Sequence, residues 1–121
     1  MKLVEMLEKN NKNILYYPKL RKITGSITAT ILLSYIIHLW KKNGGKFYKF
    51  IEPCSHPLYK EGDSWTEELE LSSAQFRGAL KKLESIGIVS HQRDGYHVTY
   101  YNLNEKVLMN AWEDIYENSI K

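Results

Sequence analysis

The clearest periodic pattern of apolar and polar positions lies between residues 65 and 89. In its second half, apolar residues recur every three or four positions, which places them along one face of a helix; these residues are Phe76, Ala79, Leu80, Leu83 and Ile86. Ser72 or Ser73 can cap the start of that helix, and Gly87 can end it in the left-handed conformation. A shorter helix over residues 65–69 comes first. The pattern predicts two helices joined by a tight turn, as in a helix-turn-helix.

The residues after Gly87 predict a β-hairpin. Asp94-Gly95 is a strong signal for a two-residue turn, because a type I′ turn needs positive φ at both central positions. The pairs that follow from this turn are Arg93 with Tyr96, Gln92 with His97, and His91 with Val98. We expect the tip to present Gln92, Arg93 and His97, and the core to receive Val89, Val98 and Tyr100. Helix-turn-helix plus hairpin predicts an α+β, mainly α-helical fold, a winged helix-turn-helix.

The rest of the chain predicts one domain over residues 1–121, with additional terminal helices at 2–10 and 104–118. The longest apolar run, Ile27–Trp40, has 14 residues and contains Thr28, Thr30, Ser34 and His38. A membrane-spanning helix needs about 20 apolar residues, so we expect a buried core helix and no membrane partner. Asn43-Gly44-Gly45 ends it, a short strand with Phe47, Tyr48 and Phe50 follows, and Asn104 caps the last helix.

The second helix of the predicted pair carries small and basic residues opposite its apolar face. Arginine can read a guanine edge or clamp a phosphate, lysine suits phosphates, and glutamine near a helix start can read adenine. At the tip of the wing, an arginine can hold the minor groove or the backbone. The residues that we expect to contact duplex DNA are Ser72, Ser73, Gln75, Arg77, Lys81, Lys82, Gln92 and Arg93, with Lys41 and Lys42 beside them.

Charge is divided unevenly along the chain. Residues 1–50 contain ten Lys/Arg and two Asp/Glu, a net charge of +8, whereas residues 51–121 contain seven and twelve, a net charge of −5. The basic residues that can line a DNA backbone are Lys19, Arg21, Lys22, Lys41, Lys42, Lys46 and Lys49. The acidic residues before and on the first helix of the pair, from Glu61 to Glu70, should keep that helix away from phosphates.

The aromatic and apolar placement in three segments resembles the winged-helix domains of phage replisome organisers, plasmid replication initiators and related proteins of mobile elements. The segments are Tyr17–Trp40, Lys46–Phe50 and Trp65–Val89, within a region of residues 17–103. The resemblance implies duplex DNA binding in transcriptional regulation or at a replication origin. The alternative is a winged helix that binds a replisome or host protein, because the acidic, proline-bounded loop from Cys54 to Asp63 suits a basic partner.

Two further features leave alternatives open. The stripe of Leu108, Trp112 and Ile115 on the last helix either forms a homodimer contact or packs on its own domain. Cys54 and His56 lie two residues apart, but catalysis or zinc binding needs further partners at defined spacings. We therefore expect a protein that is not an enzyme and has no cofactor or metal. A single cysteine is typical of the reducing cytoplasm.

Overall fold

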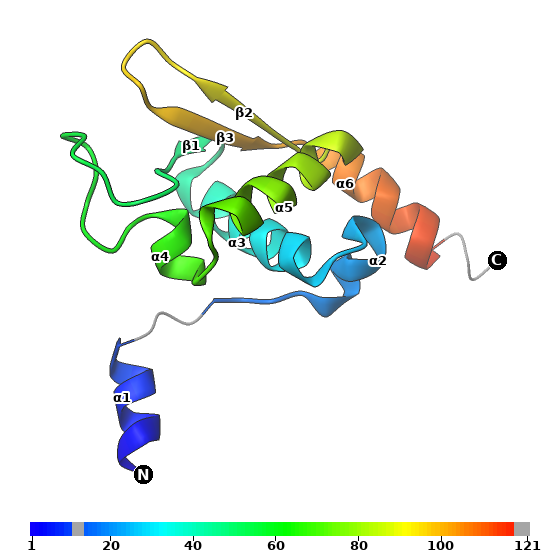
Figure 1. The fold of residues 1–121 in the computed structure, drawn as a ribbon. Coiled ribbons are helices and arrows are strands. Elements are labelled where there is room, and N and C mark those ends of the chain that lie inside the picture. The colour runs from blue at the N-terminus through cyan, green and yellow to red at the C-terminus, as the bar shows by residue number, and fades with distance from the viewer. Residues whose placement is uncertain (11–13, 118–121) are drawn as a thin grey trace.

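Helices form most of the structure, and a small antiparallel sheet lies beside them (Figure 1). The computed structural model describes residues 1–10 and 14–117. The helical elements are α1 (Lys2–Asn10), the 3-10 helix η1 (Pro18–Leu20), α2 (Arg21–Thr24), α3 (Ile27–Asn43), α4 (Trp65–Leu69), α5 (Ser73–Ile86), α6 (Glu105–Trp112) and the π-helical turn η2 (Glu113–Glu117). The strands are β1 (Phe47–Tyr48), β2 (Val89–Arg93) and β3 (Thr99–Leu103). The fold is α+β and mainly helical, as the sequence predicts.

The long helix α3 forms the centre of the core. It begins at the cap residue Ser26, whose hydroxyl accepts a hydrogen bond from the Ala29 amide, and it ends at Gly44 with φ of 72°. Four of its apolar side chains are completely buried: Ala29, Leu32, Leu33 and Ile36. Among the described residues, no single helix is long and apolar enough to cross a membrane; Pro18–Thr24 and Ile27–Asn43 reach that length only together, and they are bent by 114°. The predicted core helix is confirmed.

Helices α4 and α5 occupy the positions predicted for the paired helices. Ser64 caps α4, Ser72 caps α5, and Glu70 between them adopts a left-handed conformation that ends α4. Trp65 at the start of α4 is completely buried. Its ring stacks on Phe76 of α5 and meets Tyr101 of β3 edge-on, with centroid distances of 5.3 Å in both contacts. Trp65 therefore joins α4, α5 and the sheet.

The sheet has the strand order β1-β3-β2, and its two faces differ sharply. We call the face that packs on the helices the inner face; it carries the buried residues Phe47, Val89, Tyr101 and Leu103. The opposite, outer face carries Tyr48, Ser90, Gln92, Tyr100 and Asn102, which are exposed or partly exposed. Because side chains alternate along a strand, neighbouring residues of the hairpin point to different surfaces of the protein.

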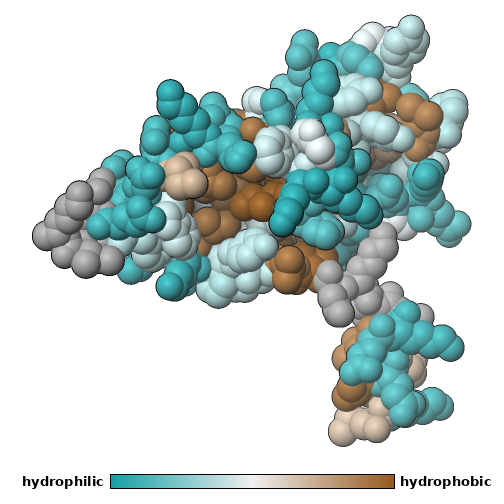
Figure 2. All heavy atoms as spheres, turned by 180° about the vertical axis from the view of Figure 1, so that it is seen from behind, coloured by the Kyte–Doolittle hydropathy of each residue, from teal (hydrophilic) through white to brown (hydrophobic). Residues whose placement is uncertain are grey.

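The terminal helices are arranged differently from each other. Helix α1 matches the predicted range and lies apart from the other helices (Figure 1). Figure 2 shows apolar atoms along one side of it, and Leu3 of this helix is 60% exposed. Helix α6 begins at the predicted cap, since the Asn104 side chain accepts a hydrogen bond from the Val107 amide. It continues as η2 to Glu117, and residue 118, the predicted end, lies outside the described residues.

Candidate nucleic-acid interface

The first turn of α5 is held by hydrogen bonds within the protein. The Ser72 hydroxyl accepts from the Gln75 amide at 3.1 Å, and the Gln75 side-chain oxygen accepts from the Ser72 amide at 2.9 Å, which forms a capping box. The Ser73 hydroxyl donates to the Glu52 carboxylate. An adenine edge needs both the oxygen and the amino group of a glutamine. The predicted reading of adenine by Gln75 therefore requires the capping box to open.

The exposed face of α5 begins after this turn and is both basic and closely approachable. Arg77 and Lys81 are exposed, and the exposed small residues Ala74 and Gly78 lie one helical turn before them and between them, respectively. A Cβ added at Gly78 would meet no atom within 4 Å, and its φ is not positive. The fold itself therefore does not require glycine there, although a glycine inside a helix costs about 0.5–1 kcal/mol relative to alanine.

Lys82 follows Gly78 by one helical turn, and its side chain reaches toward Gly25. Its Nζ lies 3.4 Å from the position that a Cβ on Gly25 would take, beside the end of α2. Lys82 is exposed, as predicted, but it extends the basic surface toward α2 and away from the wing.

The predicted register of the hairpin is wrong by three residues. Arg93 pairs with Thr99, Gln92 with Tyr100 and His91 with Tyr101. Gly95 has no positive φ, whereas His97 has φ of 62°. The reason is Asp94, whose Oδ1 accepts from the amides of Tyr96 at 2.9 Å and Val98 at 3.0 Å and so favours a longer loop, closed by a left-handed residue.

This register changes which residues face the core and which face solvent. Val89 and Val98 are buried as predicted, but Tyr101 takes the core position expected for Tyr100. The predicted tip residues Gln92, Arg93 and His97 are all exposed.

The two predicted contact residues of the wing lie on opposite faces of the hairpin. Arg93 follows the same alternation as His91 and Val89, on the inner face, and its Nη2 lies 3.2 Å from His97 Nδ1. His91 Nδ1 lies 2.8 Å from a carboxylate oxygen of Glu84 on α5, which places this side of the wing next to the helix. Gln92 points to the outer face. Arg93 can therefore act together with α5, and Gln92 cannot contact the same surface.

The predicted backbone lysines are distributed over separate parts of the molecule. Lys41 and Lys42 are exposed in the last turn of α3, the end nearest β1 (Figure 1). The Nζ atoms of Lys19 and Lys22 lie 5.9 and 5.6 Å from the Tyr116 ring centroid. Lys49, however, is only 5% exposed. The prediction that Lys49 lines a DNA backbone is wrong, because its ammonium is buried in the protein.

Lys49 is buried because it neutralises acidic residues from the loop and from α4. Its Nζ donates to Asp63 at 2.7 Å and to the carboxylate of Glu68, which also accepts from the Tyr35 hydroxyl. Burial alone would raise the pKa of Glu68, but these hydrogen bonds outweigh burial and lower the pKa to about 2. The hydroxyl of Tyr59 and that of Ser64 bond to Glu67. Three acidic residues of the predicted patch, Asp63, Glu67 and Glu68, therefore form hydrogen bonds with other residues of the protein.

The loop between β1 and α4 also holds Cys54 and His56. Cys54 is exposed. His56 Nε2 lies 2.9 Å from the Tyr96 carbonyl oxygen, so the loop contacts the tip of the wing. In the part of the chain that the structure describes, no three His, Cys, Asp or Glu side chains form a group that could hold a metal ion.

The apolar stripe of the last helix contacts its own domain. Leu108 and Trp112 are half-buried against the core. The Trp112 ring lies 4.4 Å from that of Tyr116, whose hydroxyl donates to the Lys19 carbonyl oxygen. Ile115 is half-buried. These contacts support the interpretation that the stripe packs internally, and dimerisation through it stays a prediction.

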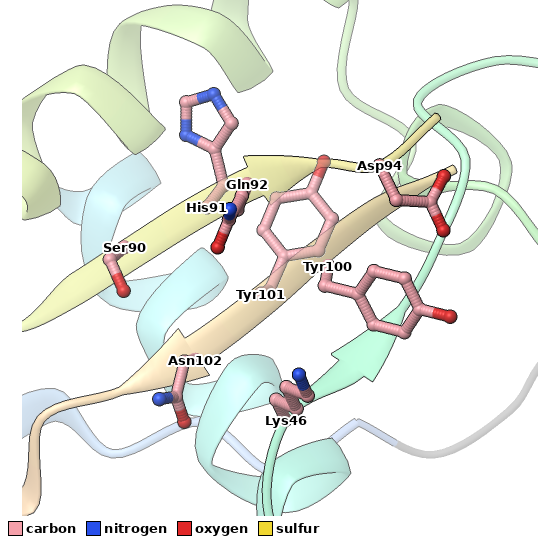
Figure 3. Close-up of a pocket in the computed structure, with 8 residues that line it drawn as sticks. All are labelled: Lys46, Ser90, His91, Gln92, Asp94, Tyr100, Tyr101 and Asn102. Atoms are coloured by element: carbon pink, nitrogen blue, oxygen red, sulfur yellow. The ribbon is translucent and has the colours of Figure 1, made fainter. Parts of the chain in front are cut away.

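The outer face of the sheet was not predicted from the sequence. A hollow of about 690 Å³ lies over β2 and β3. Figure 3 shows its lining residues, among them Lys46, Gln92, Tyr100 and Asn102. Tyr48 and Tyr100 are register partners, and their rings meet edge-on at 6.0 Å. Once Tyr101 is known to face the core, the alternation of β3 places Tyr100 and Asn102 on the other side. The predicted hairpin register placed Tyr100 in the core, so this surface could not be recognised from it.

Comparison with known proteins gives no relative for this chain: no family model, no curated protein and no solved structure matches it significantly.

Proposed function

We propose that this chain is a winged helix that binds duplex DNA through α5 and the inner side of its wing. The order of elements supports it, because α3, β1, α4, α5 and the β2–β3 hairpin follow one another as in the predicted helix-turn-helix with a wing. The sequence resemblance extends the proposal to transcriptional regulation or replication-origin binding in a mobile element. The protein acts by binding, without catalysis or a cofactor.

The observation that carries the proposal is the exposed face of α5. Arg77 and Lys81 flank Gly78, a glycine that the fold does not need, on a helix whose start is fixed by a capping box. A helix without a side chain at this position can approach a groove closely, and the two cations then reach bases or phosphates. Arg93 lies on the side of the wing that adjoins the helix, which adds a third cation to the same surface.

The proposal is tested with a duplex that the protein selects from a random library. We expect Arg77→Ala combined with Lys81→Ala to weaken binding at least tenfold in fluorescence anisotropy at moderate salt, about 1.4 kcal/mol. The matched control is Lys60→Ala combined with Lys106→Ala, which removes two exposed cations outside α5 and the wing. Equal affinity of the two double variants would contradict the proposal.

Salt dependence separates DNA binding from the alternative, a protein-interaction module. Contacts to several phosphates release counterions, so affinity for the duplex should fall steeply as salt rises. Loss of Arg77 and Lys81 should reduce the slope of log K against log salt. If the protein selects no duplex even at low salt but binds a single protein partner, the result favours the alternative.

A further inference from the structure

The outer face of the sheet is a second chemically distinct surface. Figure 3 shows Tyr100, the ammonium group of Lys46, and the polar side chains of Ser90, Gln92 and Asn102 on this surface. The ring of Tyr48, the register partner of Tyr100, adjoins the Tyr100 ring. The surface faces away from the core side of the sheet, on which His91 meets α5. A duplex held by α5 therefore does not cover it.

The aromatic part offers a place for a flat ring to stack. Tyr48 is 42% exposed, and Tyr100 lies partly exposed next to it. The Nζ of Lys46 lies 5.5 Å from the Tyr100 ring centroid, which keeps a cation beside the rings. Stacking of a base on an exposed aromatic side chain requires a base that is not already stacked in a duplex.

The polar part has a fixed donor. The Oδ1 of Asn102 accepts from Trp40 Nε1 at 3.0 Å and from the Leu103 amide at 3.1 Å. Because both bonds go to the oxygen, the amino group of the Asn102 side chain is left to donate outward. Gln92 on the neighbouring strand is exposed, with both a donor and an acceptor. These groups suit the edge of a base.

The charge around this face favours a polyanion. Residues 9–51 contain no Asp or Glu, and this stretch supplies Lys46 together with Lys41 and Lys42 at the end of α3. The acidic side chain in the hollow is Asp94, whose Oδ1 is bonded to two amides of the wing loop. Phosphates that connect stacked bases would therefore meet lysines near β1.

We propose that the outer face of the sheet binds single-stranded nucleic acid, with bases on Tyr48 and Tyr100 and phosphates on Lys46 and its neighbours. The site goes beyond the proposed duplex binding and does not use Arg77, Lys81 or Arg93. Stacked bases, hydrogen-bonding edges and connecting phosphates are shared by DNA and RNA, so the two sources are separated by the test.

The test measures binding of fluorescein-labelled oligo(dT) and oligo(rU) by anisotropy at low salt. Tyr48→Ala combined with Lys46→Ala should weaken binding of at least one strand fivefold or more, whereas Tyr48→Phe, which keeps the ring, should not. The control is Tyr96→Ala combined with Lys106→Ala, which removes the same residue types from exposed positions on the wing loop and on α6. Matching unfolding midpoints in urea show that each variant is folded.

The result with Arg77→Ala combined with Lys81→Ala separates this proposal from duplex binding. We expect that variant to bind single strands like the unmodified protein. The proposal is overturned if neither strand binds, if the Tyr96 and Lys106 control loses as much affinity as the Tyr48 and Lys46 variant, or if the α5 variant loses single-strand binding. Binding of thymidine monophosphate as tightly as the strand also overturns it, because the site then holds a free nucleotide.

Discussion

The ammonium of Lys49 and the carboxylate of Glu68 form an ion pair in the interior, and each side chain is 3% exposed. The pair links the end of β1 to α4, and Lys49 also bonds Asp63 in the loop between them. The Nζ of Lys49 lies 5.4 Å from the Trp65 ring centroid. A single cation thus positions the loop, α4 and the central tryptophan.

Removal of the cation alone should be costly. Lys49→Met leaves two carboxylates without their partner, and breaking a buried pair in this way typically costs about 3–5 kcal/mol. Combining Lys49→Met with Glu68→Leu should recover part of that loss, since an apolar pair of similar volume needs no counter-charge. Urea unfolding of the two single variants and the double variant gives the coupling energy. Additive losses would show that the pair does not act as a unit.

The same pair predicts a specific response to acid. The pKa of Glu68 is lowered from its ordinary value of 4.5 to about 2 in the folded protein. Its contribution to stability is therefore complete above about pH 4.5 and is lost as the pH falls toward 2. The midpoint of urea unfolding should drop over this range, and Glu68→Gln should drop less. Equal pH dependence in both proteins would contradict the assignment.

The elements could be predicted because their signals are local. A serine before an apolar periodicity and a glycine after it define α5. An apolar run that ends at Gly44 predicted α3, and the cap residue Asn104 predicted the start of α6. Such signals depend on backbone capping and helix periodicity, which residues a few positions apart determine. The bounds observed for these helices follow from them.

The failures involve residues that are distant in sequence or that compete for the same turn. Asp94 binds two amides of the wing loop, which outweighs the type I′ preference of Asp94-Gly95 and shifts the register. Lys49 was predicted to be a surface cation, because its partners Asp63 and Glu68 lie 14 and 19 residues away in the sequence and the ion pair could not be foreseen. The hydrogen bond from Ser73 to Glu52 could not be predicted either, because Glu52 lies 21 residues before it.

Glu52 should weaken DNA binding in the proposed complex. Its carboxylate accepts a hydrogen bond from Ser73 at the start of α5, where a phosphate would otherwise be attracted by the helix dipole. We expect Glu52→Gln to raise the affinity for duplex DNA two- to fivefold, roughly 0.4–1 kcal/mol. Glu61→Gln removes an exposed charge from the same loop and serves as the control. An equal gain in both variants would indicate a general charge effect.

The left-handed residue of the wing loop predicts that glycine is tolerated better than valine at position 97. His97 has φ of 62°, a conformation that β-branched residues strongly disfavour and glycine accepts. His97→Val should therefore destabilise the protein by about 1 kcal/mol or more, and His97→Gly should not. Thermal or urea unfolding measures the difference. Equal stability of the two variants would be inconsistent with this loop conformation.

Substitutions at Gly78 can separate the stability of α5 from its role in binding. Nothing lies within 4 Å of a Cβ at this position, so Gly78→Ala should raise the free energy of unfolding by about 0.5–1 kcal/mol. Gly78→Gln should also be at least as stable as the unmodified protein, since glutamine is a good helix former. The two variants should differ in binding. The long glutamine side chain keeps α5 from the groove and should weaken duplex affinity at least tenfold, whereas the alanine variant should bind nearly as well as glycine. If the glutamine variant binds duplex DNA with unchanged affinity, this face of α5 is not the contact surface.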